Sequence, residues 1–126
     1  MAQAKALGAC TLGLTGGEPL LRDDLESLAL AAKPEMATIV FTTGCGLDAA
    51  RARRLADAGV DCVTVGVESS EAAAHDAERR REGSFAEAAA AVRACREAGL
   101  YTALSTIGFR EKLDSGELDR LYDLAS

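Results

Sequence analysis

Short apolar runs alternate with helical patterns along the chain, and this alternation restricts the fold more than any other feature. The strand-like runs lie near residues 10–15, 37–43, 61–67 and 100–107. Helical patterns follow near residues 22–32, 48–58, 84–98 and from about 115 to the C-terminus. A repeated β-α order of this kind predicts a parallel sheet with right-handed crossovers and helices packed outside it. The expected fold class is therefore α/β.

Polar residues at the start of each helical pattern predict where the helices begin. Asp23 or Asp24 can cap the first helix, Asp48 the second and Ser84 the third. Residues 68–83, between the third strand and the third helix, form a polar and charged stretch that contains the only histidine. Because of this setting, the His75 side chain is expected to be solvated.

The length of the chain limits which α/β architectures it can complete. The sequence has 126 residues, enough for one domain over positions 1–126 with four βα units. A closed eight-unit barrel needs about 200 residues or more. Two architectures remain: a small open sheet, or an arc of a larger (β/α) barrel.

Charge and hydropathy exclude several kinds of partner. The 14 Lys and Arg residues against 20 Asp and Glu residues give a net charge of −6. Nucleic acids and anionic membranes need clustered cations, so neither is an expected partner. No apolar run approaches the roughly 18–20 residues of a membrane span, and the N-terminus lacks the apolar core of a signal peptide. These features predict a cytoplasmic protein.

The cysteines and the histidine do not form a metal-binding pattern. Cys10, Cys45, Cys62 and Cys95 include no C-x-x-C pair, and one histidine cannot build a histidine-based metal site. Free thiols are the expected state of all four cysteines, as is usual in a reducing compartment. No residue is therefore predicted to bind a metal.

In both architectures the ligand site lies where the parallel strands end. Gly16 and Gly17 follow the first strand and let a ligand approach the backbone closely, while the adjacent Glu18 can accept from a cation. The alternative is a tight turn with Glu18 in solvent. The run Arg79–Arg81 is expected either to form a solvated face or to direct one arginine inward toward a carboxylate.

Several motifs together resemble the radical S-adenosylmethionine (SAM) superfamily, closest to its peptide- and cofactor-maturing, SPASM-like branch. The matching segments are Leu14-Thr-Gly-Gly-Glu-Pro-Leu-Leu-Arg22, Thr42-Thr-Gly-Cys-Gly-Leu47, Val65-Gly-Val-Glu-Ser69, His75-Asp76, Arg79, Gly83-Ser-Phe85 and Ala98-Gly99. The likeness extends over about residues 7–113, and the spacing between these motifs makes it specific.

The resemblance implies a fold, two cofactors and a set of binding residues. The four βα units would form part of a partial TIM barrel that binds SAM and a 4Fe–4S cluster. Reductive cleavage of SAM would give a 5′-deoxyadenosyl radical that abstracts hydrogen from a peptide or small-molecule substrate. Gly16, Gly17 and Glu18 would meet the SAM ammonium group, and Arg79 its carboxylate. Glu68 and Ser69 would lie near the ribose and the carboxylate.

The chain also departs from the family pattern. Gly66 stands where members usually carry a hydroxyl, and Glu68 where they carry an aspartate. The cluster-binding C-x-x-x-C-x-x-C loop is absent. The chain therefore looks like the second-to-fifth βα segment of a radical SAM domain, truncated at both ends. Such a fragment is expected to be inactive alone.

Two other functions compete with a radical SAM fragment. One is a non-catalytic α/β binding or interaction module, and the other is an independent small α/β enzyme that shares only the Gly-Gly-Glu-Pro turn. Unpaired strands at the sheet edges predict self-association, with four apolar side chains unusually exposed: Leu12, Leu14, Leu104 and Ile107.

Overall fold

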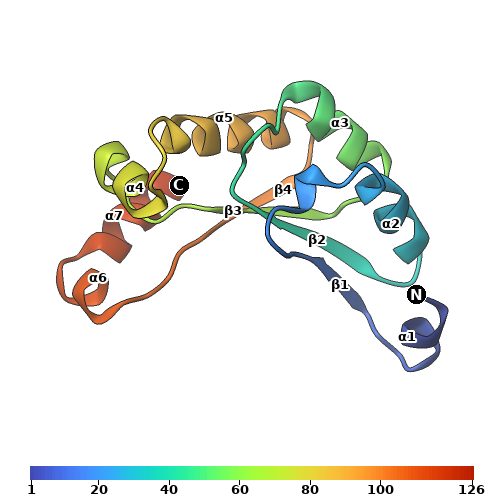
Figure 1. Cartoon of the computed structure of the whole chain (residues 1–126). Helices are drawn as coiled ribbons and strands as arrows, with labels where there is room; N and C mark the ends of the chain where they lie inside the picture. The colour runs from blue at the N-terminus through green and yellow to red at the C-terminus, as the bar shows by residue number, and fades with distance from the viewer.

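The computed structural model describes residues 1–126 and contains one sheet of four parallel strands (Figure 1). The strands are β1 (Thr11–Leu14), β2 (Ala37–Thr42), β3 (Cys62–Gly66) and β4 (Tyr101–Ser105). They lie in the order β1-β2-β3-β4, so each strand pairs with the next one along the chain. The predicted strands and their parallel pairing are confirmed. The α/β class is confirmed with them.

Three helices cross over between successive strands, and all three lie on the same side of the sheet (Figure 1). They are α2 (Leu25–Ala32), α3 (Ala49–Asp57) and α5 (Ser84–Glu97). The register places Val40 beside Val63 and Val63 beside Thr102, so the strand ends stay nearly level. Level strand ends bring the loops that follow them to a common edge.

The hydrophobic core lies between the sheet and these helices. Val40, Val63 and Val65 are fully buried on the sheet side, against Leu25 and Leu55 on the helix side. The opposite face of the sheet is uncovered: Phe41 is 41% exposed and Tyr101 is 74% exposed. Burial alternates along β2 accordingly, because successive side chains of a strand point to opposite faces.

Further short elements complete the chain. They are α1 (Ala2–Ala6), the 3₁₀ turn η1 (Pro19–Leu21), α4 (Ala72–Arg79), α6 (Arg110–Asp114) and α7 (Glu117–Ala125). Helix α7 corresponds to the predicted C-terminal helix, and its Leu121 joins the core. Helix α4 fills much of the stretch 68–83, where the sequence analysis expected only polar chain. No helix combines the length and the apolar character that crossing a membrane would require.

The predicted helix caps meet different outcomes. Asp48 caps α3, accepting a hydrogen bond from the Arg51 N–H at 2.7 Å, as predicted. Asp24 precedes α2, but its carboxylate pairs with the Arg22 guanidinium instead of capping. Ser84 is the first residue of α5 and does not cap it.

Asp76 of α4 supplies the missing cap from a distance. Its carboxylate accepts hydrogen bonds from the Gly83 N–H at 2.6 Å, the Phe85 N–H at 2.8 Å and the Ser84 hydroxyl at 2.8 Å. These bonds, with the Phe85 N–H contributing most, lower the pKa of Asp76 despite partial desolvation. Asp76 therefore fixes α4 to the start of α5.

The edge exposure predicted from the sequence is only partly correct. Ile107 is 57% exposed, as expected, whereas Leu12, Leu14 and Leu104 are half-buried. Leu14 and Leu104 pack against the core because they point to the face of the sheet that the helices cover. An edge strand thus leaves its backbone unpaired without exposing its apolar side chains fully.

We expect Asp76→Ala to lower the thermal unfolding midpoint by a few degrees, because the start of α5 loses an acceptor for three donors. Asp57→Ala is the matched control, since Asp57 ends α3 with no side-chain hydrogen bond. Circular dichroism melts of both variants measure the effect. Equal midpoints would contradict the capping role.

Candidate functional site

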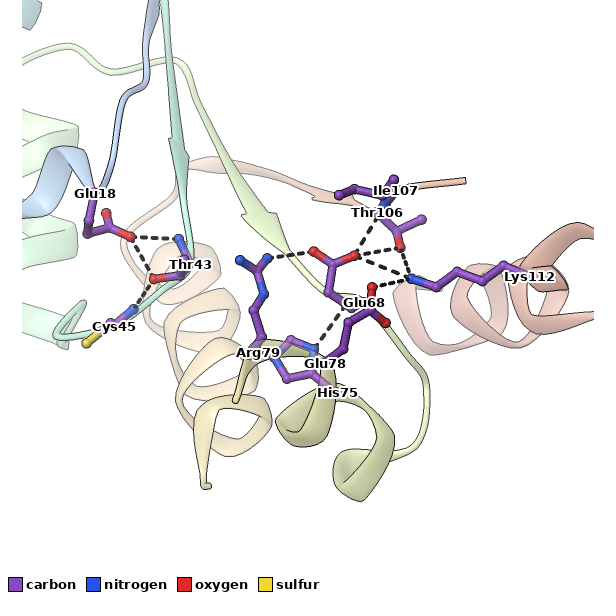
Figure 2. Close-up of polar contacts among 10 residues, drawn as sticks. All are labelled: Glu18, Thr43, Cys45, Glu68, His75, Glu78, Arg79, Thr106, Ile107 and Lys112. Carbon is purple, nitrogen blue, oxygen red and sulfur yellow. Dashed lines mark hydrogen bonds and ion pairs between the residues drawn. The ribbon is translucent and has the colours of Figure 1, made fainter. Parts of the chain in front are cut away.

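Polar side chains from all four strand ends gather at the carboxyl edge of the sheet. Glu18 follows β1, Thr43 follows β2, Glu68 follows β3 and Thr106 follows β4. Figure 2 shows Glu18 with Thr43 on one side, Glu68 with Thr106 and Lys112 on the other, and Arg79 between them. This is the edge at which the sequence predicted the ligand site.

The Glu18 carboxylate joins the ends of β1 and β2. Its Oε1 accepts from the Thr42 hydroxyl at 2.6 Å and the Leu20 N–H at 3.1 Å. Its Oε2 accepts from the Thr43 hydroxyl at 2.6 Å and the Thr43 N–H at 2.9 Å. Burial raises the pKa of Glu18, but these hydrogen bonds outweigh it, so the net pKa lies below its ordinary value. The alternative of a solvated Glu18 is wrong.

The two glycines before Glu18 leave the backbone of the turn accessible. Gly16 and Gly17 are exposed, and a Cβ placed on either would meet no atom within 4 Å. Gly16 has a φ of +138°, a backbone conformation that would be strained for any residue with a side chain. Gly17 has no such constraint. No backbone N–H donates to the carbonyl oxygens of Gly16 and Gly17, which leaves them free to accept from a ligand.

The buried Glu68 carboxylate is the centre of a second cluster. Its Oε1 accepts from Arg79 Nη2 at 2.8 Å. Its Oε2 makes longer contacts with the Ile107 N–H at 3.3 Å and with two side chains at 3.4 Å, the Thr106 hydroxyl and the Lys112 ammonium. Glu68 thus connects β3 with α4 and with the segment after β4 (Figure 2).

Arg79 reaches Glu68 with one nitrogen and leaves two without partners. Its side chain is 30% exposed, its Nε is buried with no hydrogen-bond partner, and Nη1 makes no hydrogen bond. The rest of the arginine run turns away: Arg80 ends α4 in a left-handed conformation, and Arg81 pairs with Glu87. The sequence-based expectation of one inward arginine that meets a carboxylate agrees with this arrangement.

His75 is not solvated, and that expectation is wrong. Its side chain is 1% exposed, its Nδ1 accepts the Glu68 N–H at 3.0 Å, and its ring packs edge-on against Phe85 at 5.6 Å. Accepting at Nδ1 requires a neutral ring with its proton on Nε2. Burial lowers the pKa of His75, and the nearby Arg79 charge lowers it further. The signal was present in the sequence, because His75 and Arg79 are four residues apart and share one face of α4.

Ser69 is held by a residue that the sequence analysis missed. Glu117, at the start of α7, accepts from the Ser69 hydroxyl at 2.9 Å, the Ser70 N–H at 2.6 Å and Arg120 Nη2 at 2.6 Å. The Ser70 N–H contributes most to lowering the pKa of Glu117 to about 2. Nothing in the local sequence joins positions 69 and 117, since only the fold brings them together.

The Glu18 and Glu68 clusters come near one another at Gly66, the last residue of β3. A Cβ placed on Gly66 would lie 3.7 Å from the Thr42 carbonyl oxygen and would overlap Arg79 Nη2. The structure therefore brings four of the predicted site features to one edge: the Gly16–Gly17 turn, Glu18, Glu68 and Arg79. Ser69 lies beside them, with its hydroxyl directed to Glu117.

No three His, Cys, Asp or Glu side chains are arranged to hold a metal ion. All four cysteines are free thiols, and they differ in environment: Cys10 is exposed, Cys45 and Cys62 are half-buried, and Cys95 is buried. Burial raises the pKa of the Cys95 thiol to about 11, which disfavours the thiolate that metals bind.

Parallel βα units with helices on one face and polar groups at the strand carboxyl ends define an α/β domain of the barrel-arc type. Residues 1–124 match the family described as the Radical SAM superfamily. The chain therefore belongs to the radical SAM superfamily.

Individual relatives are consistent with this membership. The chain is 37% identical over 112 residues to a pre-heme d1 synthase of Dinoroseobacter shibae, covering 87% of this chain and 28% of that protein. It is 33% identical over 125 residues to a PqqA peptide cyclase of Rhizobium meliloti, covering 98% of this chain and 33% of that protein. The chain thus spans about a third of the length of these relatives.

A solved structure of anSMEcpe with bound AdoMet has the same fold over 92% of this chain and 34% of its own length. The TM-score is 0.68 and the sequence identity is 14%. The match supports the reading of the four βα units as an arc of a radical SAM barrel.

The two cofactors that the family implies fit this chain differently. SAM carries an ammonium and a carboxylate, and the carboxyl edge offers open carbonyls at Gly16–Gly17 and unpartnered N–H groups on Arg79. A 4Fe–4S cluster needs thiolates at one corner, and no such group exists among these residues. SAM therefore fits the residues present, and the cluster does not.

Acid should weaken the attachment of α7 through Glu117. Its folded-state pKa of about 2 lies below the ordinary value of 4.5, so its contribution is complete above pH 4.5 and lost as the pH falls toward 2. We expect Glu117→Gln to be less stable than the parent at pH 7 and to show a shallower loss of stability across that range.

Urea titrations at several pH values measure this dependence. Glu111→Gln, at an exposed position of α6, is the control and should keep the parental pH profile. A Glu117→Gln profile as steep as that of the parent would contradict the assignment.

Proposed function

We propose that this chain forms the SAM-binding part of a radical SAM enzyme that abstracts hydrogen from a peptide or small-molecule substrate. The observation that carries the proposal is Arg79, which lies between the Glu18 and Glu68 clusters with unpartnered N–H groups, while Glu18 directly follows the accessible Gly16–Gly17 turn (Figure 2). An arginine fork suits a carboxylate, and open carbonyl groups suit an ammonium. Together they match the two charged ends of an amino acid, which SAM carries on its methionine portion.

The backbone of the Gly16–Gly17 turn contacts the SAM ammonium group. All four acceptor positions of the Glu18 carboxylate are already engaged, since each oxygen has two donors. The carbonyl oxygens of Gly16 and Gly17 then accept from the ammonium, while the negative charge of Glu18 stabilises it at short range. Thr42 and Thr43 hold that charge in place.

The carboxylate of SAM pairs with Arg79, and its ribose lies near Glu68 and Ser69. Arg79 can keep its bond to Glu68 through one N–H of Nη2, while the second N–H of Nη2 and Nη1 form a fork toward the ligand. The contacts of Glu68 Oε2 are 3.3–3.4 Å long, so ribose hydroxyls can replace them with shorter bonds.

SAM, when bound, supplies the group whose reductive cleavage starts hydrogen abstraction from the substrate. The residues of this chain bind and orient it, and none is assigned to the cluster. A peptide substrate is supported by the relative named as a PqqA peptide cyclase. We place the protein in the cytoplasm, because its four cysteines are free thiols. Association with a second chain would use the unpaired edges of β1 and β4.

Arg79→Lys should weaken SAM binding about tenfold or more, because a point charge cannot reproduce two parallel N–H groups. Isothermal titration calorimetry with SAM measures the change. Arg80→Lys is the matched control, since Arg80 is the next residue and is exposed.

A second ligand tests which part of SAM meets Arg79. 5′-Methylthioadenosine lacks the carboxylate and the ammonium, so its affinity should be the same for Arg79→Lys and the parent. An equal loss for both ligands would show that Arg79 supports the fold of the site and does not bind the carboxylate.

The cluster provides a separate prediction. Anaerobic reconstitution of this chain with iron and sulfide should yield far less than one 4Fe–4S cluster per chain, because no three ligating side chains converge. Iron and sulfide analysis after desalting measures the yield. A stable cluster at one per chain would contradict the assignment. If the chain binds SAM although it holds no cluster, it has the proposed SAM site. A non-catalytic interaction module would bind neither SAM nor the cluster.

A further inference from the structure

The Arg79 side chain passes over the end of β3 at Gly66, which has no side chain. The guanidinium lies against Gly66, and a Cβ on that residue would overlap Nη2, the nitrogen that bonds Glu68. The nearest other atom to that Cβ, beyond the guanidinium, is the Thr42 carbonyl oxygen at 3.7 Å. The overlap therefore concerns Arg79 alone.

The backbone of Gly66 gives no other reason for a glycine. Its φ lies outside the left-handed region, unlike that of Gly16, and it continues the ladder of β3 opposite Ser105. An alanine could adopt this conformation without strain, and glycine within a strand is itself unfavourable. A side chain at position 66 would therefore act through the space that Arg79 occupies, and not through the backbone conformation.

We propose that Gly66 is a positioning residue for Arg79, and that the absence of a side chain there sets the path by which the guanidinium reaches the ligand edge. The inference rests on the proposed function only in naming the SAM carboxylate as the group that Arg79 meets. With a side chain at position 66, Nη2 is displaced from Glu68. The guanidinium then no longer lies in its place between the Glu18 and Glu68 clusters (Figure 2).

A hydroxyl-bearing side chain at position 66 would therefore change the position of Arg79. The substitution Gly66→Ser would place a Cβ and an oxygen where the Arg79 guanidinium now lies. Arg79 would then have to leave its present position against Gly66.

The test follows the Arg79 Nε–H directly by nuclear magnetic resonance. In the parent chain its resonance should exchange slowly with water, because Nε is buried. Gly66→Ala and Gly66→Ser should shift this resonance and speed its exchange. Gly13→Ala is the matched control: Gly13 lies within β1, and its added Cβ would make an ordinary 3.5 Å contact with Phe41. That variant should leave the resonance unchanged.

A double-mutant cycle tests whether Gly66 acts through Arg79. Gly66→Ala should lower the urea midpoint in the parent and leave it unchanged or higher in an Arg79→Ala background, where the overlap is gone. The same loss in both backgrounds would overturn the proposal, as would an unchanged Nε–H resonance in Gly66→Ala.

SAM titration separates this proposal from the proposed function. If both hold, Gly66→Ala weakens SAM binding about tenfold in the parent background and has no further effect on Arg79→Ala. Coupling in the midpoint and the resonance without any change in SAM affinity would support the positioning of Arg79 by Gly66. It would at the same time reject Arg79 as the partner of the SAM carboxylate.

Discussion

The carboxylate of Glu68 is the contact on which the arrangement of the site depends. It is buried at the end of β3 and receives Arg79 from α4, together with donors from the segment after β4. A buried carboxylate without such partners would be costly, and removing one partner leaves the other charge uncompensated. The position of Arg79, and through it the charge at the carboxyl edge, follows from the need to satisfy this one group.

The uncovered face of the sheet agrees with a barrel arc in which helices occupy only the outside. Three crossover helices cover one face, and Phe41 and Tyr101 remain exposed on the other. Right-handed crossovers of similar length place successive helices on the same side of a sheet. The carboxyl edge of the sheet is then shared by loops from all four strands, which explains why residues far apart in sequence meet there.

The fold could be read from the sequence because its signals are local and repeated. The apolar run 61–67 predicts the central strand, and Asp48 correctly predicts the start of α3, since both depend on neighbouring residues only. The cap of α5 could not be read in this way. Serine is a residue type that often caps helices, so Ser84 was the expected cap. Asp76, eight positions earlier, accepts the hydrogen bonds at the start of α5 instead, because α4 lies against it.

The site was predictable where a motif fixes the backbone and not where partners come from elsewhere. The Gly16–Gly17 turn and Glu18 were identified from one short segment. The donors that fill Glu18 come from Thr42 and Thr43 on the next strand, and Glu117 reaches Ser69 across the fold. His75 was misjudged because a polar composition was taken for a solvated segment, whereas a helix there turns one face inward.

Two adjacent residues of α4 make hydrogen bonds to different elements: His75 bonds to Glu68, just beyond the end of β3, and Asp76 bonds to the start of α5. Attachment on both sides opposes tilting and sliding of α4, so rotation of its own side chain is the easiest movement for Arg79. Binding at the proposed SAM site would then begin from a backbone that is already ordered. The entropy cost of binding would fall mainly on the torsion angles of one arginine and on the ligand itself.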